Sequence, residues 1–91
     1  MKAICEMAVK HYGMQSQIDV AIEEMAELTK ALLKTRRVGG GSVSSVAEEI
    51  ADVQIMLEQL KIIFDCDNEV SVYRVKKLSR LKERIEKEIG K

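Results

Sequence analysis

Apolar side chains recur along most of the chain at intervals of three and four residues, the spacing that places them on one face of a helix. This periodicity predicts four helices, one short and three long, over residues 2–12, 16–36, 45–64 and 69–89. Gly13 is placed to end the first helix, and Gly39–Gly41 separates the second from the third. With no proline in the sequence, we expect an all-α antiparallel bundle that forms a single domain over residues 1–91.

Polar residues that commonly cap helices mark the expected helix starts. Ser16 is the expected N-cap of the second helix. Ser45 is followed three residues later by Glu48, the signature of a capping box at the start of the third helix. Asp67 or Asn68 is the expected cap of the last helix.

The third expected helix is apolar on two sides. Its main stripe runs from Val46 to Phe64, while Ile55 and Ile62 lie well round the helix from that stripe. Two apolar sides indicate burial on both, and a domain this small buries only a modest share of its surface. We therefore expect the bundle to be completed by oligomerisation, at least as a homodimer.

Charge and length exclude several kinds of partner. The 15 basic and 15 acidic residues balance, so a basic field covering the domain, typical of nucleic-acid binding, is absent. No apolar run approaches the roughly 18 residues of a membrane span, and no signal peptide precedes the first helix. We expect a cytoplasmic protein with neither nucleic acid nor membrane as partner, in which Cys5 and Cys66 are reduced, small buried residues.

Two windows of the sequence each carry a pair of carboxylates one helical turn apart. These pairs are Glu24 with Glu27 and Glu49 with Asp52. On a helical wheel Glu49 lies within an apolar stripe, and the other three acids lie at the border of one. Inward-pointing charges are costly unless paired or bound to a metal, and no Arg or Lys on these helices is placed to neutralise all four. The pattern predicts a carboxylate site for Mg²⁺ or Mn²⁺.

Two other interpretations of the acids stay open. Either pair taken alone is also typical of solvated acids on a helix surface. A di-iron or di-manganese bundle takes Glu-x-x-His from two helices, whereas His11 is the single histidine and Ala8 stands three residues before it. We therefore favour the site built from carboxylates alone.

The sequence Glu24-Met-Ala-Glu27, followed after 21 residues by Glu49-Ile-Ala-Asp52, resembles the ExxE…ExxD signature of MazG-like all-α nucleoside triphosphate pyrophosphohydrolases. The resemblance covers most of the chain. It implies a dimer or tetramer that hydrolyses an NTP or dNTP to the monophosphate and pyrophosphate. It also implies that these four acids are the catalytic residues and bind Mg²⁺. Hydrolases of several nucleotides share the pattern, so it does not identify the substrate.

A triphosphate also needs positive side chains, and the last helix carries them. Tyr73, Lys77, Arg80 and Arg84 fall within one narrow arc of that helix. Arg can hold phosphate oxygens in bidentate fashion, while Lys acts as a point charge. The Lys-Leu-Ser-Arg sequence that starts at Lys77 is similar to a Lys-Leu-x-Arg of the MazG-like proteins. We expect Lys77, Arg80 and Tyr73 to bind substrate; a solvated basic face is the alternative.

Gln17 is the last substrate-binding candidate. It lies up to two turns before the acids and is expected to contact the base or sugar, unless it is an exposed residue near a helix start. Lys34, Arg36 and Arg37 gather at the end of the second helix, where positive charge suits the helix dipole. The alternative function is a non-catalytic helical oligomerisation module, which predicts no effect of metal on stability.

Overall fold

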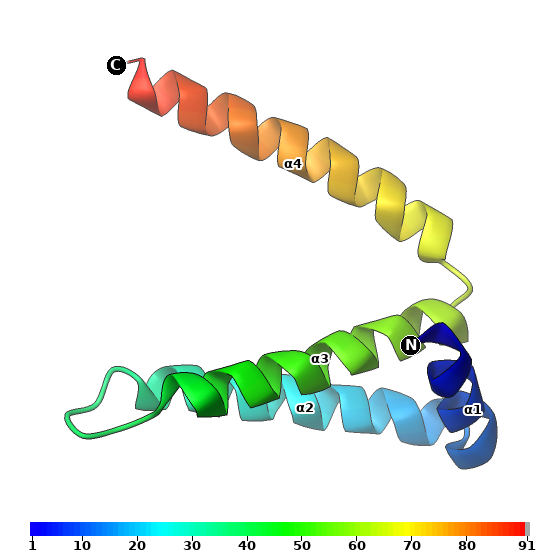
Figure 1. Cartoon of the computed structure of the whole chain (residues 1–91). Coiled ribbons are helices and arrows are strands. Elements are labelled where there is room, and N and C mark those ends of the chain that lie inside the picture. Colours follow the sequence, from blue (N-terminus) through cyan, green and yellow to red (C-terminus); the bar gives the residue numbers. More distant parts are fainter. Residues whose placement is uncertain (91) are drawn as a thin grey trace.

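The computed structural model describes residues 1–90, and within them all regular structure is helical. The helices are α1 (Lys2–Tyr12), α2 (Met14–Lys34), α3 (Val43–Ile63) and α4 (Asp67–Ile89). α2 and α3 lie side by side and antiparallel, and α1 crosses them at one end (Figure 1). The predicted all-α class, with one short and three long helices, is confirmed.

A single glycine separates α1 from α2. Gly13 has a φ of 93°, which an L side chain rarely adopts. Its N–H donates to the Val9 carbonyl at 2.9 Å, and its carbonyl accepts from the Gln17 N–H at 3.1 Å. The same residue thus ends one helix and begins the next. The prediction that Ser16 caps α2 is wrong, because Gly13 makes the whole turn and Ser16 lies within the helix.

α3 begins earlier than expected because another serine caps it. The Ser45 N–H donates to Ser42 Oγ at 3.1 Å, and the Ser42 hydroxyl donates to Ser45 Oγ at 3.0 Å. Ser42 is therefore the N-cap, and the predicted capping box of Ser45 with Glu48 is wrong. In the loop before it, Gly39 and Gly41 have positive φ, of 71° and 38°, which confirms that the glycines break the helix.

The packed body of the molecule consists of α1, α2 and α3, and its core is small. The buried apolar side chains are Cys5, Ala21, Ala31 and Met56. Two polar side chains are buried as well: Gln17 Nε2 donates to Gln59 Oε1 at 2.7 Å, from α2 to α3. The expected burial of Cys5 is confirmed, and that burial raises the pKa of its thiol. Cys66 is half-buried.

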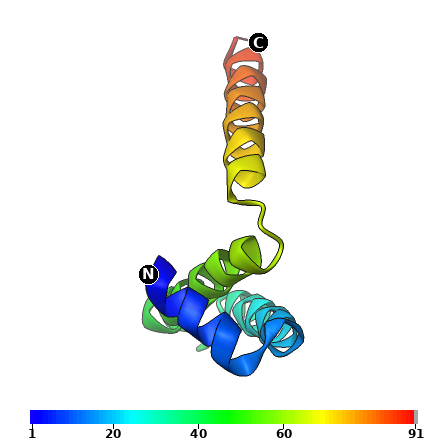
Figure 2. The ribbon, with the colours of Figure 1, turned by 90° about the vertical axis from the view of Figure 1, so that its right-hand side faces the viewer.

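α4 stands away from this body, as Figures 1 and 2 show. Among the described helices it comes near α3 alone, and none of its residues is buried. The radius of gyration is 16.7 Å, whereas a compact chain of this length would have about 12 Å. The expected antiparallel bundle of four helices is therefore present in one chain as three packed helices and one extended helix. Within residues 1–90, no helix has both the length and the apolar composition needed to span a membrane.

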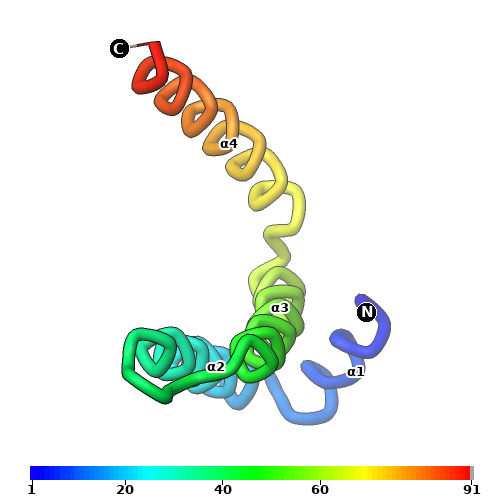
Figure 3. The backbone as a smooth tube through the Cα atoms, turned by 60° about the vertical axis from the view of Figure 1, so that its left-hand side comes forward, coloured from blue at the N-terminus to red at the C-terminus, as the bar shows by residue number. Residues whose placement is uncertain are grey.

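A short joint directs α4 away from the end of α3 (Figure 3). Lys61 Nζ lies 2.9 Å from a Glu58 oxygen and 3.2 Å from an Asp67 oxygen, so one ammonium group links both helices. The prediction that Asp67 or Asn68 caps α4 is wrong, because Cys66 occupies the cap position and makes no side-chain cap. Asp67 instead pairs with Lys61.

Candidate metal centre

Three carboxylates meet between α2 and α3. One oxygen from each of Glu24, Glu49 and Asp52 lies within 4.8 Å of the other two. All three residues are half-buried. They meet because α2 and α3 are antiparallel, which sets the second half of α2 against the first half of α3 (Figure 1). The structure thus brings together three of the four acids that the sequence singles out.

Partial burial and neighbouring negative charge make Glu24 and Glu49 harder to ionise. Partial burial raises the pKa of Glu24 most, followed by the charges of Asp52 and Glu49. Partial burial also raises the pKa of Glu49, with further contributions from Asp52 and Glu27. Within residues 1–90, no Lys or Arg forms an ion pair with any of the three clustered acids. A bound cation would therefore relieve a repulsion that these residues leave uncompensated.

Glu27, the fourth predicted acid, lies beside the group of three rather than in it. Its Oε1 lies 3.7 Å from Lys30 Nζ, and 51% of its side chain is exposed. Glu27 follows Glu24 by three residues, which turns it about 60° round the helix and toward solvent. It acts on the group through its charge, as its contribution to the raised pKa of Glu49 shows.

The donor set of the three acids suits a hard divalent cation. Mg²⁺ takes oxygen ligands and is commonly bound through one or two carboxylates together with water and substrate phosphates. Neither histidine nor cysteine joins the group among the residues described, and these are the ligands that zinc and most iron sites use. The chemistry of the donors therefore fits Mg²⁺ or Mn²⁺.

Gln17 occupies a different place from the one expected. It is 6% exposed, and its amide is hydrogen-bonded to Gln59 between the helices. It lies seven residues before Glu24, which is about 10 Å along the helix axis. We therefore remove Gln17 from the proposed substrate contacts. Its hydrogen bond to Gln59 instead fixes how α2 and α3 are aligned along their axes. A glutamine on the inward face of each of two neighbouring helices is the signal that indicates such a pair.

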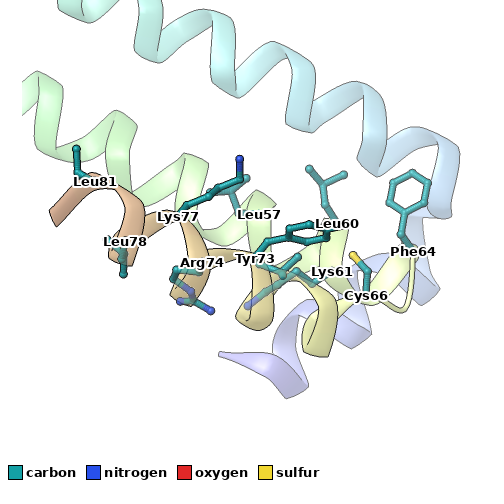
Figure 4. A pocket seen from close by; sticks show the side chains of 11 residues that line it. Leu57, Leu60, Lys61, Phe64, Cys66, Tyr73, Arg74, Lys77, Leu78 and Leu81 are labelled. Carbon is teal, nitrogen blue, oxygen red and sulfur yellow. The ribbon is translucent and has the colours of Figure 1, made fainter. Parts of the chain in front are cut away.

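The predicted phosphate-binding side chains lie on α4, apart from the three acids. Lys77 and Arg80, with Leu81 and Arg84, line a hollow of about 380 Å³ that α4 alone provides. Tyr73 and Lys77 also line an apolar groove of about 800 Å³ between α3 and α4 (Figure 4). None of the three acids lines either hollow. One chain therefore does not place these side chains beside its own group of three acids.

A smaller hollow, of about 140 Å³, adjoins the acids where α2 ends and α3 begins. It is lined by Glu27, Lys30, Ala31, Lys34, Gly41, Ser45 and Glu49. The sequence pattern assigns Lys34 to the end of α2 and does not connect Lys30 with the site. Lys30 and Lys34 follow Glu27 by three and seven residues, and this spacing places both lysines on the same side of the helix as Glu27.

Comparison of the chain with known protein families, with curated proteins and with solved structures finds no match. The function must therefore be argued from the site and from the spacing of its acids.

Proposed function

We propose that the protein is a Mg²⁺-dependent nucleoside triphosphate pyrophosphohydrolase that converts an NTP or dNTP to the monophosphate and pyrophosphate. The observation that carries this proposal is the meeting of Glu24, Glu49 and Asp52 within 4.8 Å across two antiparallel helices. The same acids belong to the pattern that resembles MazG-like hydrolases. The spacing of the acids and their meeting in space are both consistent with this function.

In this proposal each acid has a definite task. Glu24, Glu49 and Asp52 hold Mg²⁺, with Mn²⁺ as a substitute. The bound ion neutralises phosphate charge and lowers the pKa of water. One of the four acids takes the proton of the attacking water, and Glu27, beside the group of three, adds negative charge nearby.

We also propose that the protein works as a homodimer or homotetramer. α4 leaves apolar side chains in solvent, including Leu78 at 58% and Val75 at 69% exposure. The groove between α3 and α4 adds Leu57 and Leu60 to this surface. A second copy would remove it from water, which is the main favourable term in protein association.

The proposal is tested by measuring pyrophosphate release from a panel of NTPs and dNTPs with Mg²⁺. We expect turnover of at least one nucleotide, lost when a chelator is added and lost in Glu24→Gln. Circular dichroism shows whether the variant keeps its helices. The proposal is refuted if no nucleotide is hydrolysed and Glu24→Gln behaves like the parent protein in every measurement.

A non-catalytic oligomerisation module is the second candidate, and the exposed apolar side of α4 favours it. Such a module would self-associate without any effect of Mg²⁺ on its melting temperature. A metal centre predicts that Mg²⁺ raises the melting temperature and that a chelator reverses the rise. One thermal melt in each condition therefore separates the two candidates.

A further inference from the structure

The hollow between the end of α2 and the start of α3 shares a residue with the metal centre. Glu49 belongs to the group of three acids and also lines the hollow. Lys30 and Lys34 line the same hollow from α2. Of the basic residues that the structure describes, these two lie in a hollow with a metal-centre acid, whereas Lys77 and Arg80 do not.

The two lysines differ in how they are engaged. Lys30 lies 3.7 Å from Glu27, and its side chain is 64% exposed, so this pair is weak. Lys34 forms no ion pair with any carboxylate within residues 1–90. An ammonium group in this position offers three N–H donors to an anion.

The opposite wall of the hollow also offers a donor. Ser45 lies in the first turn of α3, where the helix dipole favours negative charge. Its N–H is paired with Ser42 Oγ, while its hydroxyl, which accepts from the Ser42 hydroxyl, has one proton to donate. The hollow thus presents one hydroxyl and two ammonium groups within reach of a metal centre.

The hollow is small and carries several polar side chains. Its volume of about 140 Å³ is the smallest of the three hollows described above, and its lysines and serine supply donors that suit phosphate oxygens.

We propose that this hollow holds the terminal phosphates of the substrate, with Lys34 and Lys30 as their cationic contacts and Ser45 as a hydroxyl donor. The proposal rests on the proposed function, because the acids must hold a cation beside it. Two lysines and two carboxylates leave the lining without net charge. Pyrophosphate therefore binds well only when Mg²⁺ is present. Bound Mg²⁺ strengthens the binding of pyrophosphate, and bound pyrophosphate strengthens the binding of Mg²⁺ to the same extent.

Titration calorimetry with inorganic pyrophosphate, with and without Mg²⁺, tests this assignment in the full chain. We expect binding that needs Mg²⁺, and we expect Lys34→Ala to weaken it at least about tenfold, the effect of one charge-assisted hydrogen bond. Lys34→Arg should keep most of the affinity. Lys10→Ala, which removes an exposed lysine of α1 far from the hollow, should bind like the parent protein.

The outcomes separate this inference from the proposed function. Suppose that the parent protein hydrolyses a nucleotide and that Lys34→Ala binds pyrophosphate as tightly as the parent protein. If the double variant Lys77→Ala, Arg80→Ala then binds pyrophosphate more weakly, the phosphates lie on α4. In that case this inference fails and the proposed function stands. If the parent protein binds no pyrophosphate with Mg²⁺, the inference fails whether or not nucleotides are hydrolysed. If it also hydrolyses none, the proposed function fails too. Circular dichroism and thermal melts show that each variant is folded.

Discussion

The α2–α3 hairpin and α4 depart from the usual arrangement of side chains in opposite ways. The hairpin turns polar groups inward: three half-buried carboxylates and a buried pair of glutamines. α4 turns apolar groups outward, and none of its residues is buried. Clustered carboxylates favour a bound cation or a proton, and a large exposed apolar surface favours contact with another protein. The two regions therefore call for different kinds of partner, and each can be tested without the other.

The largest expected effect separates the three acids that meet between α2 and α3 from Glu27 beside them. Glu24→Gln removes a charged ligand and should lower nucleotide hydrolysis at least about 100-fold, since even residues that only support a metal ligand cost 10–100-fold. Glu27→Gln should cost less than that, because Glu27 is half exposed and pairs with Lys30. The measurement is kcat/KM of both variants at saturating Mg²⁺. Equal losses would show that all four acids bind the metal.

The next effect concerns the outward face of α4. Leu78→Gln should weaken self-association at least about tenfold, because a leucine that is buried on assembly contributes about 1.5–3 kcal/mol. Sedimentation equilibrium over a range of concentrations measures the change. Lys76→Gln is the matched control, since it changes an exposed residue on the opposite side of the same helix. A monomeric parent protein at micromolar concentration would contradict the proposed assembly.

Within the hairpin, the buried glutamine pair should contribute to stability but not to substrate binding. Gln17→Leu leaves the Gln59 amide buried without its partner and should destabilise the fold by about 1–3 kcal/mol. Adding Gln59→Leu should recover much of this loss, because neither polar group then remains. Urea denaturation measures both variants. A raised KM in a folded Gln17→Leu protein would restore Gln17 as a substrate contact.

The smallest expected effect is a dependence of metal-free stability on pH. Glu24 and Glu49 have a higher pKa in the folded chain than in the unfolded chain, so as pH rises their carboxyl groups lose their protons first in the unfolded chain. The protonated carboxyl groups therefore stabilise the folded chain fully at pH values below the ordinary carboxyl pKa. This stabilisation is lost as pH rises through the raised pKa values. Solvent screening keeps this effect small. Urea denaturation in a chelator at several pH values should show the fall, and Glu24→Gln should make it shallower.

Helical periodicity predicts which side chains share a face of one helix, and at that level the sequence is informative. The four helices and the break at the glycines follow from it, and so does the place of Glu24, Glu49 and Asp52 within or beside the apolar stripe of their own helices. Helix starts are less predictable, because several hydroxyls compete for the same exposed N–H groups. Ser42 caps α3 instead of Ser45 for this reason, and Gly13 makes the cap at Ser16 unnecessary.

The distances between helices do not follow from periodicity. The rotation of α2 against α3 decides that Glu27 stays outside the group of acids and that Lys34 faces the hollow. That rotation depends on contacts between distant residues, such as the bond from Gln17 to Gln59. The direction of α4 depends on the joint after α3, where periodic spacing ends. For this reason Lys77 and Arg80 are on the predicted helix but line hollows apart from the three acids of the same chain.

The backbone at the joint after α3 sets the direction in which the whole of α4 extends. Asp65 has a φ of 49°, and Lys61 bridges the joint to Asp67. The 23 residues of α4 extend about 34 Å. A rotation of about 10° at Asp65 therefore moves the far end of α4 by about 6 Å, by the geometry of a helix of that length. A substitution that changes the backbone conformation of Asp65 would therefore move every protein surface that packs on the far end of α4.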